Sequence, residues 1–221
     1  MSSIIELYSR HAGSYDQWYT DNQDLYEQEV NLVRRLIVAG LPPDLSVKNS
    51  LGLEVGAGSG RFAARIPISH GLEPAAGMAE LARKRGVNII SGLAEDLPFP
   101  ALYFDYVAFL TSLCFVNDAD LALREASRVL KPTGFIVIAF LNKGTAAGRL
   151  LLESRHQDPF LARARLYDEE ELRRLLRANE LRIEQSLQIV MSEEVGPAIR
   201  SGLDQGLYCG VRVRRELSPN A

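Results

Sequence analysis

The sequence is poor in the residues that usually mark a secreted or a metal-binding protein. Its 221 residues include two cysteines, three histidines and one tryptophan. Cys114 and Cys209 are far apart and have no metal-ligand spacing, and two cysteines make a disulfide framework improbable. We therefore expect no metal site, no disulfide framework and a reducing, cytoplasmic environment.

Long apolar runs and an excess of basic charge are also missing. No apolar segment approaches the roughly 20 residues that cross a bilayer, and no signal-peptide pattern is visible. The net charge is −3, from 25 Lys and Arg against 28 Asp and Glu. Nucleic-acid binders usually carry a basic surface instead. We expect one globular domain with some elaboration, with no membrane span and no nucleic-acid partner.

The most informative stretch is LGLEVGAGSGR at residues 51–61. Its apolar start predicts a buried parallel strand, and its alternate glycines predict a tight turn onto a helix start, where backbone amides can face a ligand. The dinucleotide fingerprint G-x-G-x-x-G has a glycine where this chain has Arg61. Glu54 would repel a pyrophosphate but attract an ammonium group. The remaining alternative is a turn that binds no ligand.

The motif Glu54-x-Gly56-x-Gly58-x-Gly60 resembles the first motif of class I S-adenosylmethionine-dependent methyltransferases. Later segments resemble the same family in the same order, mainly GLEPAAGMAELAR, GLAEDLPF and LREASRVLKPTG. The resemblance covers about residues 50–180 and is strongest to the methyltransferase type 11 group, which contains the quinone-biosynthesis methyltransferases. It implies a Rossmann-like α/β fold with a seven-stranded sheet, mostly parallel, closed by a C-terminal antiparallel hairpin and covered by helices on both faces.

The resemblance also implies S-adenosylmethionine as the cofactor, S-adenosylhomocysteine as the product, and a set of binding residues. Glu73 ends the second expected strand, where a carboxylate can accept ribose hydroxyls. The Ala94 amide and the Glu95 or Asp96 carboxylate would contact adenine, although Leu93 stands where many members have Asp. The expected cofactor-binding residues are Glu54, Gly56, Ala57, Gly58, Gly60, Glu73, Pro74, Met78, Ala94, Glu95, Leu97, Leu110 and Thr111.

Residues 1–45 are expected to form an N-terminal helical cap or lid, and residues 46–221 the methyltransferase domain. The cap aromatics either pack on the body or close over a ligand, and the sequence leaves both open. Residues 142–167 are expected to form an insertion over the acceptor site. We interpret the basic side chains of this insertion as solvated charges rather than as a site for an anionic acceptor. The candidate substrate residues are Tyr15, Trp18, Tyr19, Cys114 and His156.

The chain after the insertion predicts a helix that starts with the D-x-x-E capping box at Asp168. Strands are expected at residues 182–191 and 206–214, with a loop and a partial helix at 192–205 between them. In the second strand, Cys209, Val211 and Val213 alternate with residues of the opposite face.

These observations predict a methyltransferase that acts on a small molecule. The activated methyl group needs an acceptor held in line and shielded from water, so no catalytic residue is assigned. Tyr15, Thr111 and His156 are candidate bases, and Cys114 is preferred as an apolar wall residue over a nucleophile. The rival hypotheses are a non-catalytic S-adenosylmethionine-binding regulator and an NAD-dependent oxidoreductase. A protein or RNA acceptor is a further variant.

Overall fold

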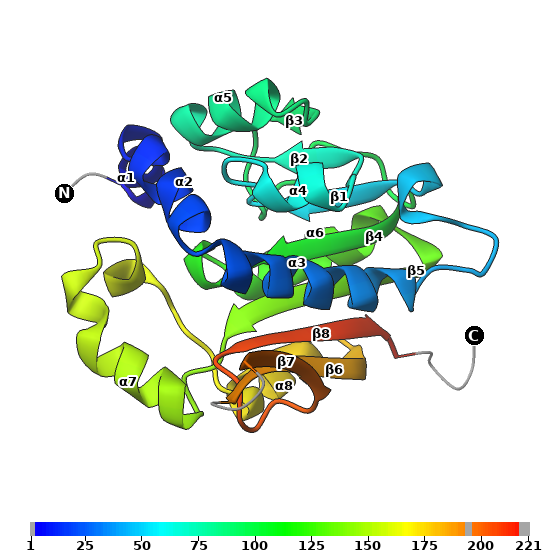
Figure 1. Ribbon diagram of the computed structural model, residues 1–221. Coiled ribbons are helices and arrows are strands. Elements are labelled where there is room, and N and C mark those ends of the chain that lie inside the picture. The colour runs from blue at the N-terminus through cyan, green and yellow to red at the C-terminus, as the bar shows by residue number, and fades with distance from the viewer. Residues whose placement is uncertain (1–2, 193–195, 217–221) are drawn as a thin grey trace.

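One continuous eight-stranded sheet runs through the protein, in the order β3-β2-β1-β4-β5-β8-β6-β7 (Figure 1). The computed structural model describes residues 3–192 and 196–216. The first five strands of that order are parallel, and β8, β6 and β7 pair in antiparallel fashion. The strands are β1 (Gly52–Val55), β2 (His70–Leu72), β3 (Ile89–Ile90), β4 (Phe104–Leu110), β5 (Leu130–Leu141), β6 (Leu181–Ser192), β7 (Gly196–Ser201) and β8 (Tyr208–Arg215).

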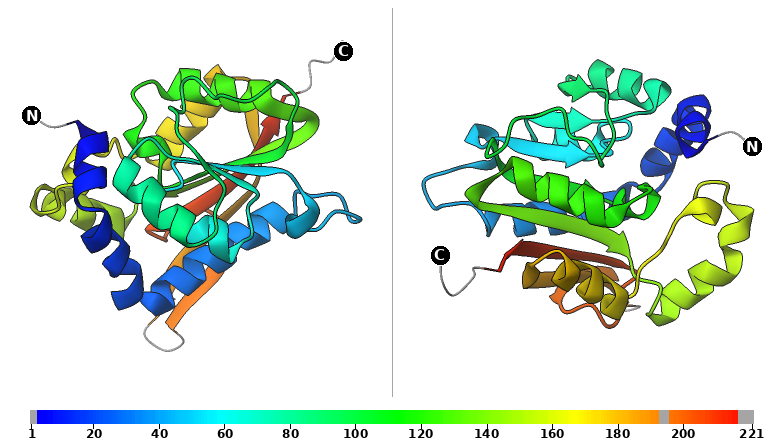
Figure 2. Two further views of the ribbon diagram at one scale, coloured as in Figure 1. Left: turned by 90° about the horizontal axis from the view of Figure 1, so that it is seen from above. Right: turned by 180° about the vertical axis from the view of Figure 1, so that it is seen from behind.

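Helices cover both faces of this sheet. Helices α3, α4 and α5 pack on one face, and α6 and α8 pack on the other, as the view from behind in Figure 2 shows. No helix within the described residues is both long and apolar enough to cross a bilayer. The helices are α1 (Ile4–Arg10), α2 (Ala12–Asp21), α3 (Gln23–Val38), α4 (Arg61–Arg65), α5 (Ala76–Lys84), α6 (Ala119–Val129), α7 (Ala146–Ser154) and α8 (Glu169–Ala178).

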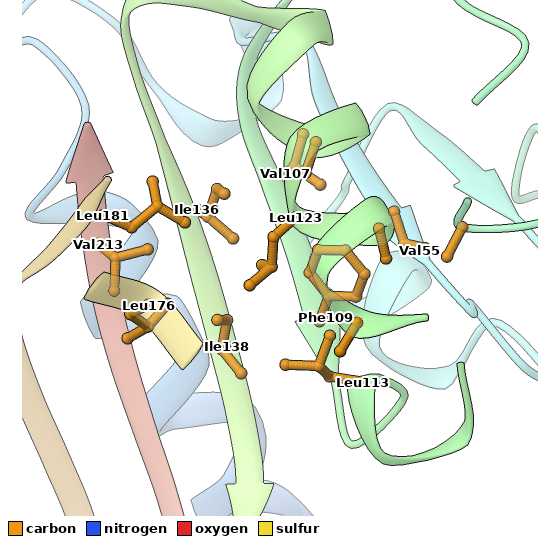
Figure 3. Packing of buried hydrophobic residues seen from close by; sticks show 14 of the residues in the cluster. Val55, Val107, Phe109, Leu113, Leu123, Ile136, Ile138, Leu176, Leu181 and Val213 are labelled. Atoms are coloured by element: carbon orange, nitrogen blue, oxygen red, sulfur yellow. The ribbon is translucent and has the colours of Figure 1, made fainter. Parts of the chain in front are cut away.

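The central strand β4 shows why the core has two halves. Its residues point alternately to the two faces of the sheet, as in any strand. Val107 and Phe109 belong to the half under α6 and α8, while Tyr106 and Ala108 belong to the half under α3. Figure 3 shows the first half, where Phe109 lies close to Leu123 of α6. A strand that is apolar on both sides is typical of a parallel sheet with helices on both faces.

The capping box before α8 is confirmed. The Asp168 side chain accepts from the Glu171 amide at 2.8 Å, and the Glu171 side chain accepts from the Asp168 amide at 3.1 Å. The predicted alternation in β8 is also confirmed, because Cys209, Val211 and Val213 enter one core cluster and Tyr208 the other.

The expected number of strands was wrong by one. Residues 196–201 were predicted as part of a loop with a partial helix, but they form β7, which pairs with β6 from Leu187↔Ser201 to Ser192↔Gly196. Residues 193–195 of that predicted loop lie outside the described residues. Strand β7 is an edge strand, where Pro197 is tolerated because one side of the strand needs no partner. Its sequence GPAIRS lacks the apolar alternation that identifies a strand.

The carboxyl ends of the parallel strands meet at the edge where α1 and α2 lie (Figure 1). Helix α7 and the segment that follows it come to the same edge from below in that view. In open sheets of this kind, ligands bind in the crevice outside the carboxyl ends of the strands. The fold therefore brings the N-terminal helices and residues 142–167 to the edge where a ligand is expected.

Candidate functional site

A cleft opens at the carboxyl ends of β1, β2 and β4. It encloses about 830 Å³ of empty space, including its open mouth. Its residues come from α1, α2, the glycine turn, the end of β2, residues 92–95 and residues 110–117. Predicted cofactor residues that line it are Gly56, Gly58, Glu73, Pro74, Met78, Ala94, Glu95, Leu110 and Thr111.

Gly58 lies at the floor of the cleft, in the turn between β1 and α4. Its φ angle of +54° lies in the left-handed region that favours glycine. A Cβ atom built on Gly58 would have no heavy atom within 4 Å, so this side of the turn is open to a ligand. Gly60 does not line the cleft, and a Cβ there would meet Ala82 of α5 at 2.8 Å. The turn thus combines one packing glycine with one that faces open space.

Glu73 is held at the end of β2 by two backbone amides. Its Oε2 accepts from the Gly58 amide at 2.7 Å, and its Oε1 accepts from the Ala75 amide at 2.8 Å. Burial raises the pKa of Glu73, and these two amides oppose that rise. Each carboxylate oxygen retains a lone pair. The carboxylate is therefore fixed in place at the cleft with acceptor capacity left for hydroxyl donors.

Glu54 lies in a side pocket of about 280 Å³ that adjoins the cleft. Four residues line both spaces: Tyr15, Gly56, Gly58 and Leu110. Ala57 lines the side pocket but not the cleft. The Glu54 side chain is 2% exposed and its Oε2 has no hydrogen-bond partner within the described residues. Burial raises the pKa of Glu54 well above its usual value.

The expected adenine region is only partly assembled as predicted. Ala94 and Glu95 line the cleft, as does Leu93. Glu95 already uses one oxygen, because its Oε1 accepts from the Asn117 amide at 2.7 Å. Leu97 belongs to the buried core and does not line the cleft. Residues 94–97 are thus tied to the start of α6, and only Oε2 of Glu95 is left for a ligand amine.

Thr111 ends β4 in an uncommon conformation. Its φ angle is +55°, which a β-branched residue rarely adopts. Its hydroxyl donates to the Leu110 carbonyl at 2.7 Å, and its amide donates to the Ala139 carbonyl at 2.9 Å. Backbone strain of this kind gathers at ligand sites, which agrees with the position of Leu110 and Thr111 on the cleft wall.

Helix α1, which lies in the segment predicted as a cap or lid, forms a wall of the cleft. Ile4, Ile5 and Tyr8 line the cleft from this helix. The helix approaches α5 closely, since the Gly77 amide donates to the Ser9 hydroxyl at 2.9 Å and a Cβ on Gly77 would lie 2.2 Å from the Ser9 carbonyl oxygen.

An aromatic cluster joins the N-terminal helices to the insertion. The Tyr8 ring lies 5.2 Å from Tyr15, 5.3 Å from Phe115 and 4.7 Å from Phe160, measured between ring centroids. The Tyr15 and Phe160 rings are 5.2 Å apart. Three separate segments therefore meet through their aromatic rings, of which Tyr8, Tyr15 and Phe115 line the cleft.

Asp16 fastens α2 to the glycine turn. Its carboxylate accepts from Arg61 at 2.8 Å, from Arg85 at 2.6 Å and from the Ser59 hydroxyl at 2.5 Å. Burial alone would raise the pKa of Asp16, but the hydrogen bonds from Arg61, Ser59 and Arg85 outweigh it and lower the value to about 2. These partners are 43 to 69 residues away in the chain. No local pattern in the sequence indicates this contact.

The candidate substrate residues separate into two groups. Tyr15 and Tyr19 line the side pocket and their hydroxyls are 3.3 Å apart. Trp18 is 42% exposed, and neither it nor His156 lines the cleft or the side pocket. Cys114 lines neither space either, and burial raises the pKa of its thiol to about 12, which disfavours a nucleophile.

The insertion's basic side chains do not line the cleft or the side pocket either. Arg149 donates to the Gly144 carbonyl at 2.7 Å, and the Arg165 guanidinium lies 5.5 Å from the centre of the Tyr167 ring. Among the described residues, no group of three or more His, Cys, Asp and Glu side chains could hold a metal ion.

These features fit a ligand that carries both a ribose and an ammonium group. Glu73 offers oxygens to hydroxyl donors, and the unpartnered Oε2 of Glu54 offers an acceptor to an ammonium group. The open space beside Gly58 admits such a ligand to the backbone. The residues present therefore suit S-adenosylmethionine.

The comparisons with known proteins agree with this fit. The family model described as "Methyltransferase domain" matches residues 53–138. An uncharacterized protein of Methanocaldococcus jannaschii is 31% identical over 173 residues, which cover 78% of this chain and 80% of that protein. An uncharacterized Mycobacterium tuberculosis protein is 34% identical over 177 residues, which are 79% of this chain but 59% of that relative's length.

Two further relatives have descriptive names. The ubiquinone/menaquinone biosynthesis C-methyltransferase of Serratia proteamaculans is 43% identical over 68 residues, covering 29% of this chain and 27% of that protein. A solved S-adenosylmethionine-dependent methyltransferase of Thermotoga maritima, described as a possible histamine N-methyltransferase, has a TM-score of 0.85 and 29% identity. The match covers 97% of this chain and 100% of that one. None of these similarities supports an NAD-dependent oxidoreductase or a non-catalytic regulator.

Proposed function

This chain belongs to the class I S-adenosylmethionine-dependent methyltransferases, in the group that includes the quinone-biosynthesis enzymes, and we propose that it methylates a small molecule. The methyl donor would lie in the cleft, and the acceptor would lie under the N-terminal helices and residues 142–167. The reaction is a transfer of the donor's methyl group to a nucleophilic atom of the acceptor.

The observation that carries this proposal is the position of Glu73. Its two oxygens are fixed by the amides of Gly58 and Ala75 at the mouth of the glycine turn. This arrangement suits the paired hydroxyls of a ribose, which donate to a carboxylate. The second carboxylate, Glu54, lies buried beside the glycine turn and would disfavour a ligand pyrophosphate, which supports a nucleoside ligand over a dinucleotide.

The other assigned roles follow from the same cleft. Glu54 would accept the ammonium group of the cofactor's methionine portion. The Ala94 amide and the free Oε2 of Glu95 would meet the adenine ring, and Pro74 and Met78 would pack against the nucleoside. We assign residues 1–45 as a helical cap, residues 46–221 as the catalytic domain and residues 142–167 as the insertion that completes the acceptor site.

The chain's own contribution to the reaction is orientation and the exclusion of water. When bound, the cofactor supplies a methyl group already activated by its sulfonium charge. Tyr8, Tyr15 and Phe160 would cover the reacting atoms and keep them dry. Burial raises the pKa of Tyr15 to about 12, so its phenol stays protonated near neutral pH. Tyr15 is therefore proposed as a hydrogen-bond donor and a wall, not as a base.

An assay of S-adenosylhomocysteine formation tests the catalytic function. The purified protein is incubated with S-adenosylmethionine and a panel of small amines, phenols, thiols and carboxylates. We expect product formation that depends on at least one acceptor. If S-adenosylmethionine binds but every acceptor leaves it unchanged, the non-catalytic binder replaces our proposal.

A further inference from the structure

A second group of buried polar side chains lies beside the cleft, and two of its members, Glu29 and Tyr208, line neither the cleft nor the side pocket. We call it the Glu29 cluster, and it consists of Glu29 on α3, Tyr15 and Tyr19 on α2, and Tyr208 at the start of β8. Glu29, Tyr19 and Tyr208 are 7%, 8% and 4% exposed. These residues are far apart in the chain and come together only in the fold.

The packing of α3 places Glu29 at the ligand edge of the sheet. Gly40, just after α3, lies against Phe135, at the edge of the sheet opposite to the ligand edge. Further back along α3, Leu32 lies against β8, since a Cβ on Gly210 would meet Leu32 at 2.6 Å. Glu29 lies about one helical turn before Leu32. Tyr208 lies two residues before Gly210 and pairs with Leu141, where β5 ends. Both residues therefore lie near the carboxyl ends of the strands.

Tyr19, Tyr208 and Glu54 also lie on the same face of the sheet, the face that α3 covers. Tyr19 and Tyr208 belong to the core half under α3. Glu54 alternates with Leu53 and Val55, which belong to the other half, so its side chain is directed to the α3 face. Tyr15 joins the Glu29 cluster to the cleft and the side pocket, since it lines both.

The polar groups of the Glu29 cluster are mostly unpartnered. The Tyr208 hydroxyl has no hydrogen-bond partner within the described residues, and no hydrogen bond or ion pair reaches the Glu29 carboxylate from them. The hydrogen bond inside the cluster is the 3.3 Å contact between the Tyr15 and Tyr19 hydroxyls. A buried polar group left unpaired, such as the Tyr208 hydroxyl, is destabilising, so such groups usually await water, an ion or a ligand.

We propose that the Glu29 cluster binds the amino group of the methyl acceptor, so that the protein is an amine N-methyltransferase; this rests on the function proposed above. An ammonium group offers several N–H donors and a positive charge, which match an unpaired carboxylate and phenol oxygens. Aromatic faces also attract such cations. The rings of Tyr8, Phe115 and Phe160 next to Tyr15 favour an amine that carries an apolar or aromatic body.

The reaction at this site balances with one proton passing through Glu29. The bound ammonium gives a proton to the Glu29 carboxylate, which passes it to solvent. The nitrogen lone pair then forms the new bond to the methyl carbon as the carbon–sulfur bond breaks, and the electron pair of that bond stays on sulfur. The products are an N-methylated ammonium and the neutral thioether. Burial raises the pKa of Glu29 to about 8, which suits this exchange near neutral pH.

The test is a calorimetric titration of the protein saturated with S-adenosylhomocysteine. The probes are primary amines from butylamine to 2-phenylethylamine, each paired with the alcohol of the same shape. The proteins are the wild type, Glu29→Gln, Tyr208→Phe and the control Glu27→Gln. Glu27 lies on the same helix but pairs with Arg65 at the surface, at 2.6 Å. Each titration is repeated in two buffers of different protonation enthalpy, which measures protons released.

We expect at least one amine to bind about tenfold or more tightly than its alcohol, and Glu29→Gln to abolish that preference. Tyr208→Phe should weaken amine binding less, and Glu27→Gln should leave it unchanged. Wild type should release protons when an amine binds, because the cation drives ionisation of Glu29. The titratable groups that face Glu29 are Tyr15, Tyr19, Tyr208 and Glu54. Glu29→Gln should release no protons.

The inference is overturned if no amine binds better than its alcohol, or if Glu29→Gln keeps the full preference. The first result would mean that the Glu29 cluster holds water only. The binding of S-adenosylhomocysteine in the same experiment separates the two proposals. If wild type binds S-adenosylhomocysteine normally while amines show no preference, the methyltransferase proposal stands and the amine assignment fails.

Discussion

Glu29 is a buried carboxyl group whose charge state should be visible in the stability of the protein. Burial raises the pKa of Glu29 to about 8 from the usual 4.5, so the folded state holds its proton more tightly than the unfolded state does. Wild-type stability should therefore fall as the pH rises from about 4.5 to 8 and then level off. Glu29→Gln keeps the shape and cannot ionise.

We predict that Glu29→Gln becomes more stable than wild type as the pH rises, by roughly 2–5 kcal/mol at pH 8, and that the two proteins are equal near pH 4.5. Urea unfolding of both proteins between pH 5 and 8.5 measures this difference. Parallel stability curves across that range would show that the Glu29 carboxyl is already ionised in the folded protein, contrary to our account.

At the residue scale, the sequence predicted some groups of the candidate site and missed others for a physical reason. Glu73 could be predicted because it follows a short strand in register with the glycine turn. Glu29 and Tyr208 could not, since one lies in an ordinary amphipathic helix and the other at a strand start. Only the packing of α3 across β8 makes neighbours of residues from opposite ends of the chain. Leu97 was expected at the site but is a core residue.

At the element scale, α2 is held by one carboxylate and two guanidinium groups. Asp16 joins Arg61 and Arg85, and the Arg61 side chain also donates to Thr20 at 2.9 Å. These contacts fix the helix that carries Tyr15 and Tyr19. The orientation of the aromatic cap therefore depends on Asp16.

We predict that Asp16→Asn lowers the free energy of unfolding by about 1–3 kcal/mol at pH 7 and speeds amide hydrogen exchange in α1 and α2. The matched control is Glu27→Gln, which breaks an exposed ion pair and should cost less than about 1 kcal/mol. Denaturant unfolding and hydrogen exchange measure the two effects. Equal losses in the two variants, with α2 still protected, would contradict a specific fastening role for Asp16.

The elements themselves were largely predictable where local signals exist. The capping box at Asp168 and the apolar strand at residues 104–110 each start or fill an element by local chemistry. Strand β7 was missed because an edge strand needs pairing on one side only and keeps polar, Pro and Gly residues. Helix α1 lines the cleft through a tertiary contact at Gly77, which no local pattern encodes.

At the scale of the whole molecule, the parallel half of the sheet and the N-terminal helices α1 and α2 build the cleft. The cleft takes residues from α1, β1, β2, β4 and the loops that follow them. The antiparallel half contributes Tyr208 and supports α3, which carries Glu29. We therefore propose that the cofactor binds at the parallel half and the acceptor amine at the junction of the two halves.

Calorimetric titration with S-adenosylhomocysteine, and separately with NAD, tests the central claim most directly. We predict binding of S-adenosylhomocysteine alone, weakened roughly a hundredfold or more by Glu73→Ala, because two hydroxyls lose a charged acceptor. The control Glu80→Ala removes an exposed carboxylate of α5 that pairs with Lys84 and should bind as wild type does. Binding of NAD alone, or S-adenosylhomocysteine binding that Glu73→Ala leaves intact, would contradict the account.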